Sequence, residues 1–237
     1  MSGTKKEKPA LLLAGGRQTA EADMVRMLSR AFNQIEKPKA AYIGAANKDN
    51  IIFFERMKSL LKRAGADRVD AVKLSANKIK PEQVKNTLSR ADVIFISGGE
   101  VEDGMDAIRK HRLFDFIKEL FAQGKQFVGI SAGTIMMGTH WMRCKKPDDY
   151  DTAELFECLG IIPEVFDTHA EDEDWIELKT VLRLLGDGAR GYGIKAGGQI
   201  SADSGGILEN LEKTVLKYTN DNAKIILESG SLGQQTK

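Results

Sequence analysis

The sequence has few cysteines, no excess of either charge and no long apolar run, and each shortage excludes a class of protein. Its 237 residues carry 35 basic residues, 34 acidic residues and only two cysteines. Cys144 and Cys158 match neither a disulfide framework nor a zinc-ligand spacing, which indicates free thiols in a reducing compartment. A net charge of +1 argues against a nucleic-acid-binding protein, which usually carries a basic excess.

The N-terminal region gives no sign of a membrane segment. Residues 1–9 are polar and basic, and the apolar run that follows, residues 10–14, is far too short for a signal peptide or a membrane span. We therefore expect a cytoplasmic protein without membrane contacts, either a monomer or a homodimer. Because no linker composition divides the chain, we expect one domain over residues 1–237, with flexible tails at 1–8 and 229–237.

Short apolar runs alternate with longer helical patterns, which is typical of a parallel sheet covered by helices on both faces. The apolar runs are residues 10–14, 40–44, 69–74, 93–97, 126–130 and 161–166, and the helical patterns are residues 21–35, 51–64, 81–89, 105–123 and 174–185. The last third of the chain, from residue 192, reads as short antiparallel strands. The pattern predicts a flavodoxin-like, three-layer α/β/α fold with a mostly parallel central sheet.

One segment at the end of a predicted strand has the pattern of a nucleophile elbow. Gly129-Ile130-Ser131-Ala132-Gly133 follows the Gly-x-Ser-x-Gly pattern, with a buried strand before it and a helical stretch through His140 after it. In an elbow the chain turns so sharply that the nucleophile's backbone is strained and the flanking positions must be small. The turn also directs N–H groups of the helix N-terminus at a developing oxyanion. We expect strained dihedral angles at Ser131.

A nucleophilic serine needs a base, and the positions of the three histidines favour His169. His111 lies in a basic helical stretch, which a solvated surface explains. His140 lies nine residues after Ser131, half a turn off its helix face and about 13 Å along the axis. His169 follows a predicted strand at the carboxyl edge, where open α/β sheets build their sites. We expect it within hydrogen-bond reach of Ser131.

The acid that would orient the histidine is ambiguous from the residues alone. Acidic residues lie between the serine and the histidine and also flank the histidine: Asp148, Asp149, Asp151, Asp167 and the run 171–174. Gly98-Gly99 ends the strand before the elbow strand. It is either a plain turn or, with Ala132, an oxyanion hole built from backbone N–H groups.

Four segments together resemble the successive motifs of peptidase family S51. They are residues 96–100 (Ile-Ser-Gly-Gly-Glu), 129–134 (Gly-Ile-Ser-Ala-Gly-Thr), 159–163 (Leu-Gly-Ile-Ile-Pro) and 166–169 (Phe-Asp-Thr-His). This family includes dipeptidase E and cyanophycinase and has the class I glutamine amidotransferase-like fold. The resemblance covers roughly residues 8–215. It implies a serine hydrolase without metal or cofactor: Ser131 is the nucleophile, His169 the base, Gly99 and Ala132 the oxyanion donors, and Asp148 or Asp149 the acid.

Two segments depart from the family pattern. The family often has Gly-Ile-Asp-Glu where this chain reads Gly-Ile-Lys195-Ala196, and aspartyl dipeptidases have an aromatic residue and arginines where residues 170–175 read Ala-Glu-Asp-Glu-Asp-Trp. An acidic loop would repel an aspartate side chain and favour a cationic one. The sequence therefore predicts a serine hydrolase that cleaves a small basic or neutral peptide or isopeptide. The alternative is a non-catalytic binding or sensor module on the same fold. Serine at the elbow disfavours a glutamine amidotransferase or a cysteine hydrolase.

Overall fold

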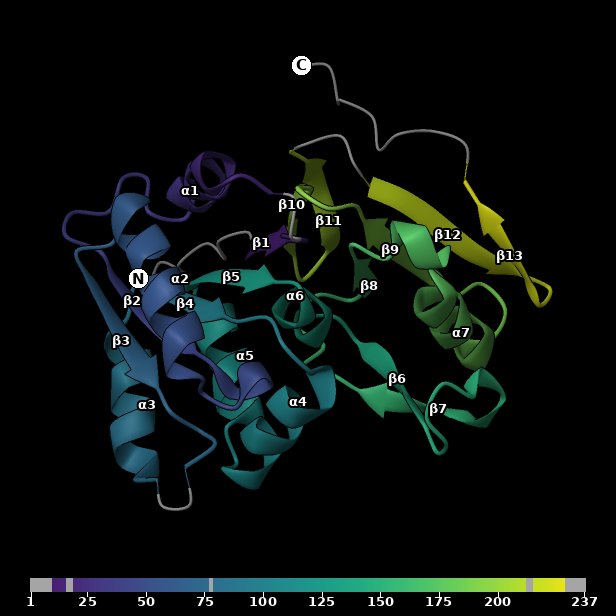
Figure 1. The fold of residues 1–237 in the computed structure, drawn as a ribbon, viewed down its shortest axis with the longest axis horizontal. Helices are drawn as coiled ribbons and strands as arrows, with labels where there is room; N and C mark the ends of the chain where they lie inside the picture. The colour runs from purple at the N-terminus through teal and green to yellow at the C-terminus, as the bar shows by residue number, and fades with distance from the viewer. Residues whose placement is uncertain (1–9, 16–18, 77–78, 212–214, 229–237) are drawn as a thin grey trace, which may run out of the picture.

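The computed structural model describes residues 10–15, 19–76, 79–211 and 215–228, and it confirms the expected fold class (Figure 1). The expected tails at 1–8 and 229–237 lie outside these residues. The central sheet has the order β11-β10-β1-β5-β4-β2-β3. Its parallel strands are β1 (Ala10–Leu13), β5 (Gln126–Ile130), β4 (Val93–Ile96), β2 (Lys39–Ile43) and β3 (Arg68–Val72). The antiparallel strands β10 (Gln199–Asp203) and β11 (Gly206–Asn210) extend one edge.

The alternation of side chains along β4 shows how helices cover both faces of this sheet. Val93 and Phe95 belong to one hydrophobic core cluster, and Ile94 and Ile96 belong to the other. The helices α1 (Glu21–Ser29) and α2 (Ile51–Arg63) pack into the first cluster, and α3 (Pro81–Arg90), α4 (Val101–Lys110) and α5 (Phe114–Ala122) into the second. Burial on both faces is typical of parallel strands. None of the helices in the described ranges is long and apolar enough to cross a membrane.

The C-terminal part of the chain adds a second sheet beside the first, with the order β13-β12-β9-β8. Its strands are β8 (Val165–Thr168), β9 (Arg190–Ile194), β12 (Val215–Asp221) and β13 (Lys224–Leu227), and α7 (Ile176–Leu185) contacts all four of them. The hairpin of β6 (His140–Cys144) and β7 (Ala153–Glu157) also contacts α7. Figure 1 shows the short helix α6 (Ala132–Met137) between the central sheet and these C-terminal elements.

The structure differs from the predicted elements at four places. The helix expected at 105–123 is two helices, because the chain turns at Arg112 with φ 54°. The elbow helix ends at Met137 rather than continuing through His140, because Gly138 is extended and the Thr139 N–H donates to the Glu164 carbonyl. The strand expected over 161–166 begins only at residue 165. Of the short strands expected from residue 192, β9 pairs with β8 in parallel, and β10 and β11 join the central sheet.

Candidate active site

The turn from β5 into α6 holds Ser131 in an unusual backbone conformation. Its dihedral angles are φ 53° and ψ −124°, which confirms the expected strain. The Ser131 N–H donates to the Leu13 carbonyl (2.9 Å), and its own carbonyl accepts from the Thr134 N–H (2.8 Å). The Thr134 hydroxyl also donates to the Leu13 carbonyl (2.9 Å). One carbonyl of the neighbouring strand β1 therefore holds both Ser131 and Thr134 of the turn.

The two glycines of the elbow lie where no side chain fits. A Cβ atom on Gly133 would lie 2.1 Å from the carbonyl oxygen of Ile96, and one on Gly129 would lie 2.8 Å from the carbonyl oxygen of Gly133. Backbone atoms cannot rotate out of the way as a flexible side chain can. The Gly-x-Ser-x-Gly pattern is thus required by the close approach of β4, β5 and α6.

His169 lies directly after β8, and the fold brings it to Ser131 across 38 residues of sequence. Its Nε2 atom is 2.7 Å from Ser131 Oγ, which confirms the predicted hydrogen-bond distance. The His169 N–H donates to the Ile194 carbonyl (2.9 Å), and its φ is 46°, so this residue too is held in a left-handed conformation. The ring of His111 instead contacts the carbonyl of Leu74 (2.8 Å).

A side-chain network fixes the turn that follows β4. Asn47 Nδ2 donates to the carbonyl of Gly98 (3.1 Å) and to Ser97 Oγ (2.9 Å). The hydroxyl of Ser97 accepts in turn from the hydroxyl of Tyr42 (2.9 Å). In a trans peptide the carbonyl and the following N–H point in opposite directions. The bond from Asn47 to the Gly98 carbonyl therefore turns the next N–H, that of Gly99, away from Asn47.

The Gly98–Gly99 turn and the start of α6 bring free backbone N–H groups to the serine. A Cβ atom on Gly98 would lie 3.1 Å from Ser131 Cβ, so the turn is in contact with the elbow. Gly99 has φ 141°, a conformation that favours glycine, and it packs against the backbone of Ala46. Gly99 and Ala132 both line the cleft at Ser131. Within the described residues neither of their N–H groups has a hydrogen-bond partner.

The cleft at Ser131 is small and its walls are acidic. Its volume is about 220 Å³, below the roughly 300–1,000 Å³ of pockets for drug-sized ligands. Besides Ser131, His169 and the two N–H donors, it is lined by Trp141 and by the carboxylates of Glu100, Asp167, Glu173 and Glu177. His169 is the one lining side chain able to carry a positive charge among the residues that the structure describes.

The acids that the family resemblance implies lie on the turn between β6 and β7. Asp148 is exposed and Asp149 is half-buried, and neither lines the cleft. No hydrogen bond or ion pair among the described residues joins either carboxylate to His169. Burial raises the pKa of Cys144, and the negative charges of Glu177, Asp149 and Asp148 raise it further, so this turn lies near the acidic side of the cleft. Their assignment as the acid stays a prediction.

Two of the cleft carboxylates, Glu100 and Glu177, were not among the candidate acids that the sequence offered, whereas Asp167 and Glu173 were. Asp167 is almost fully buried, and burial raises its pKa to about 7. Burial also raises the pKa of Glu177 to about 7, and the negative charges of Glu173 and Glu100 raise it further. The position of Glu100 directly after Gly98-Gly99 could have marked it in the sequence as a residue of the cleft. Nothing local marked Glu177, since only the packing of α7 brings it to the cleft.

The acidic run after His169 faces the cleft with only one of its four carboxylates. Glu171 accepts from the N–H of Ala196 (3.1 Å), and Asp174 pairs with Lys179 (2.8 Å). Glu173 alone of this run lines the cleft. The two departures from the family pattern, at Lys195-Ala196 and in the acidic run, are therefore in direct contact.

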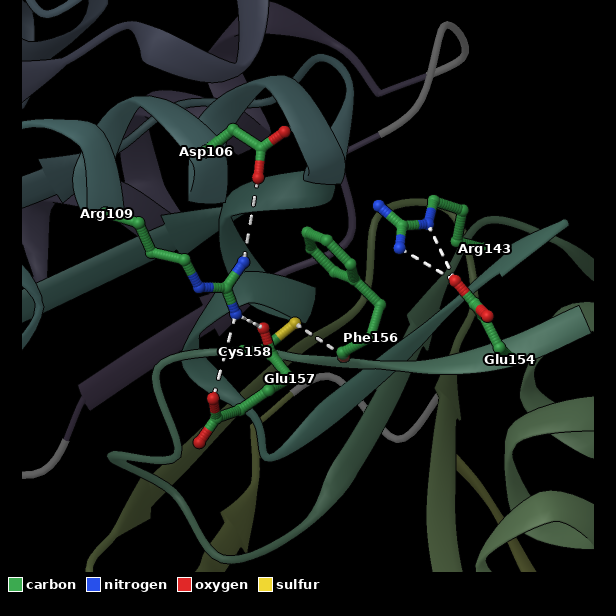
Figure 2. A network of polar contacts seen from close by, with 7 residues as sticks. All are labelled: Asp106, Arg109, Arg143, Glu154, Phe156, Glu157 and Cys158. Carbon is green, nitrogen blue, oxygen red and sulfur yellow. Dashed lines mark hydrogen bonds and ion pairs between the residues drawn. The ribbon is translucent and has the colours of Figure 1, made fainter. Parts of the chain in front are cut away.

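Trp141 reaches the cleft from the β6–β7 hairpin, and a cation–π contact between Arg109 and Phe156 anchors this hairpin to α4. Phe156 of β7 lies between the guanidinium groups of Arg109 (4.8 Å from the ring centroid) and Arg143 (5.5 Å), as Figure 2 shows. Arg143 also pairs with Glu154 across the hairpin (2.7 Å). This stack holds in place the strand that carries Trp141.

Comparisons with known proteins give the family and the fold of the chain. The model of peptidase family S51 matches residues 10–208. A candidate peptidase E from Listeria monocytogenes EGD-e has a similar structure, with a TM-score of 0.65 at 16% identity, covering 87% of this chain and 100% of that one. A peptidase from an acI-B1 actinobacterium has a TM-score of 0.64 at 18% identity, covering 94% of this chain and 95% of that one. No curated protein sequence matches the chain. The family match, over most of the chain, supports a peptidase and hence a hydrolase function, and the chain belongs to peptidase family S51.

Proposed function

We propose that the protein is a serine-type peptidase that cleaves a small peptide or isopeptide through an acyl-enzyme on Ser131. The observation that carries this proposal is the 2.7 Å contact between Ser131 Oγ and His169 Nε2 at a strained strand-to-helix turn. A serine hydroxyl becomes nucleophilic when an adjacent base accepts its proton. The small volume of the cleft favours a short substrate. We further propose that the protein acts in the cytoplasm, where its two cysteines, which are free, stay reduced.

The reaction uses the geometry around Ser131 in two steps. In the first, Ser131 Oγ attacks the carbonyl carbon of the scissile bond while His169 Nε2 takes the hydroxyl proton. The tetrahedral oxyanion accepts hydrogen bonds from the N–H groups of Ala132 and Gly99. The C–N bond then breaks, and His169 gives its proton to the leaving amine. In the second step, His169 takes a proton from a water molecule as its oxygen attacks the acyl carbon; the ester bond to Ser131 Oγ then breaks, His169 returns the proton to Oγ, and the acid is released.

The Gly98–Gly99 turn supports this reaction by being fixed before the substrate binds. Asn47 holds the Gly98 carbonyl, and the Glu100 N–H donates to the Ala46 carbonyl (2.7 Å) on the other side of Gly99. An N–H that is already oriented needs no reorganisation when the oxyanion forms. Asn47 is therefore proposed as a positioning residue rather than a catalytic one.

For the third member of the triad we keep Asp148 or Asp149, as the family resemblance implies. Both lie on the turn of the hairpin that carries Trp141 into the cleft. After burial, the charges of Glu177, Asp149 and Asp148 all raise the pKa of Cys144, so the two aspartates and the cleft residue Glu177 lie near the same thiol. For either carboxylate to reach His169 Nδ1, this turn must move toward the cleft. The other carboxylates near the histidine are Asp167, Glu173 and Glu177.

The experiment that tests the proposal is hydrolysis of a dipeptide library by the wild-type protein and by two variants. Ser131→Ala and His169→Ala should each lower the rate by about 10⁴-fold or more, because the nucleophile and base act as a unit. The control is His111→Ala, because this ring contacts the Leu74 carbonyl and does not line the cleft. If the wild-type protein hydrolyses no library member, the alternative of a non-catalytic binding module is favoured instead.

A further inference from the structure

The four cleft carboxylates come from separate parts of the fold and face one small space. Glu100 precedes α4, Asp167 lies in β8, Glu173 lies in the short 3-10 helix η3 (Glu171–Glu173), and Glu177 lies in the first turn of α7. In the described part of the chain Glu100, Glu173 and Glu177 form no ion pair. Glu171 and Asp174 of the acidic run have partners elsewhere, and three of the four cleft carboxylates come from outside this run, so the convergence is not the side effect of one acidic loop.

Two buried polar atoms in the same wall have no partner. Asp167 is 3% exposed, and its Oδ1 accepts from the Thr168 N–H (2.7 Å), whereas its Oδ2 has no hydrogen-bond partner among the described residues. Thr168 is also 3% exposed, and its hydroxyl is likewise unpartnered there. A buried polar atom without a partner costs roughly 1–3 kcal/mol. Both residues line the cleft, so these two atoms lie just behind its surface.

The electrostatics of the wall point to a positively charged donor. Glu177 lies in the first turn of α7, where the helix dipole favours a negative charge. Its pKa is nevertheless raised to about 7, by burial first and then by Glu173 and Glu100. These carboxylates thus lack a counter-charge in a partly desolvated space, where a charged hydrogen bond is stronger than at the surface.

We propose that Glu100, Glu173 and Glu177 form a subsite, with the buried polar side chains of Asp167 and Thr168 behind it, that binds a cationic nitrogen of the substrate, an ammonium or a guanidinium group, beside Ser131. The inference rests on the proposed function, since the cation belongs to the molecule that Ser131 cleaves. The cationic nitrogen comes either from the free α-amino group of a short peptide or from a basic side chain. In both cases an N-terminal aspartate side chain is excluded from this wall by repulsion.

The test uses four amides that separate the two sources of charge: lysinamide, norleucinamide and the Nα-acetyl form of each. Their binding to Ser131→Ala is measured by calorimetry at 50 and 300 mM salt. We expect each cationic group that reaches the subsite to strengthen binding by about tenfold or more, and the gain to shrink at high salt. Loss of binding on acetylation identifies the α-amino group, and a lysine-over-norleucine preference identifies a basic side chain.

Variants connect the preference to the named residues. Glu177→Gln and Glu173→Gln, made in the Ser131→Ala background, should each remove most of the gain. Asp174→Asn is the matched control, because this carboxylate belongs to the same acidic run but pairs with Lys179 and does not line the cleft. Equal binding of all four amides, or a preference that survives both substitutions, would overturn the proposal.

The outcome for the subsite can be told apart from the outcome for the proposed function. Labelling of the wild-type serine by a fluorophosphonate reports the nucleophile without requiring any substrate charge. A labelled Ser131 with no cation preference would leave the peptidase proposal standing and refute the subsite. Tight cation binding without labelling would support the subsite and refute the serine mechanism.

Discussion

Replacing Gly99 by alanine perturbs the oxyanion site at a single, well-defined point. An added Cβ would lie 2.1 Å from the Ala46 carbonyl oxygen, 2.3 Å from its carbon and 2.7 Å from the Asn47 nitrogen. All three are backbone atoms of one short 3-10 helix, η1 (Ala45–Asn47). The φ of 141° at Gly99 is also one that alanine rarely adopts. The turn must therefore move.

The size of this movement sets the expected loss of activity. Carbon–oxygen contacts are normally roughly 3.3–3.6 Å, so the turn must shift by about 1 Å away from Ala46. That shift disturbs the hydrogen bonds that hold Gly98 and Glu100, and it displaces the Gly99 N–H relative to Ser131. A misplacement of about 1 Å can cost about 10²-fold, and loss of one oxyanion donor costs about 10²–10³-fold in kcat. We expect kcat to fall by that factor.

The assay is hydrolysis of a 4-nitrophenyl ester, because an activated ester does not depend on the unknown peptide sequence. The matched control is Gly188→Ala. This glycine also has a positive φ (78°), but a Cβ there would have no heavy atom within 4 Å. The control should lose some stability and keep kcat. A folded Gly99→Ala protein with wild-type kcat would refute the assignment of the Gly99 N–H as an oxyanion donor.

Three further predictions concern the groups around the serine. Asn47→Ala should lower kcat by about tenfold with little change in KM, because it frees the Gly98–Gly99 peptide without removing a binding contact; a change confined to KM would contradict the positioning role. Asp148→Asn or Asp149→Asn should lower kcat by about 10²–10⁴-fold if that carboxylate orients His169; a loss of kcat of that size at saturating substrate on Glu177→Gln but on neither of these would move the role to the cleft wall. The pKa of Glu177 is raised from 4.5 to about 7, so the folded state binds more protons than the unfolded state across this window, and stability falls as the pH rises through it. Glu177→Gln should flatten the profile and raise the free energy of unfolding at pH 8 by about 1–3 kcal/mol, measured by urea unfolding at pH 5–8; a steeper profile in the variant would contradict this sign.

The elbow could be predicted from the sequence because its physical cause is local. Gly129, Ser131 and Gly133 lie within five residues, and the apolar run before them marks the strand. His169 could be predicted because it follows a strand, and the carboxyl ends of parallel strands meet at one edge. The strained angles at Ser131 and its distance to His169 followed from these two features.

The acidic wall could not be predicted, because its members meet only through tertiary packing. Glu100 and Glu177 lie on opposite sides of the elbow in the sequence, and α7 reaches the cleft only by docking on the second sheet. The sequence predicted no strand between the elbow helix and residue 161, yet this segment forms the β6–β7 hairpin that carries Trp141. The pair that anchors it, Arg109 and Phe156, joins α4 to β7 and is too far apart in the sequence for a local pattern to predict it. The acidic run itself was visible, but which of its carboxylates faces the cleft was not.

The central claim is that His169 activates Ser131 as a nucleophile, and covalent labelling tests it most directly. The wild-type protein is treated with a fluorophosphonate, and the modified residue is located by peptide mass spectrometry. We predict a single adduct on Ser131, absent from Ser131→Ala and formed at least about 10²-fold more slowly in His169→Ala. An adduct on another residue, no adduct at all, or an equal rate in His169→Ala would contradict the claim.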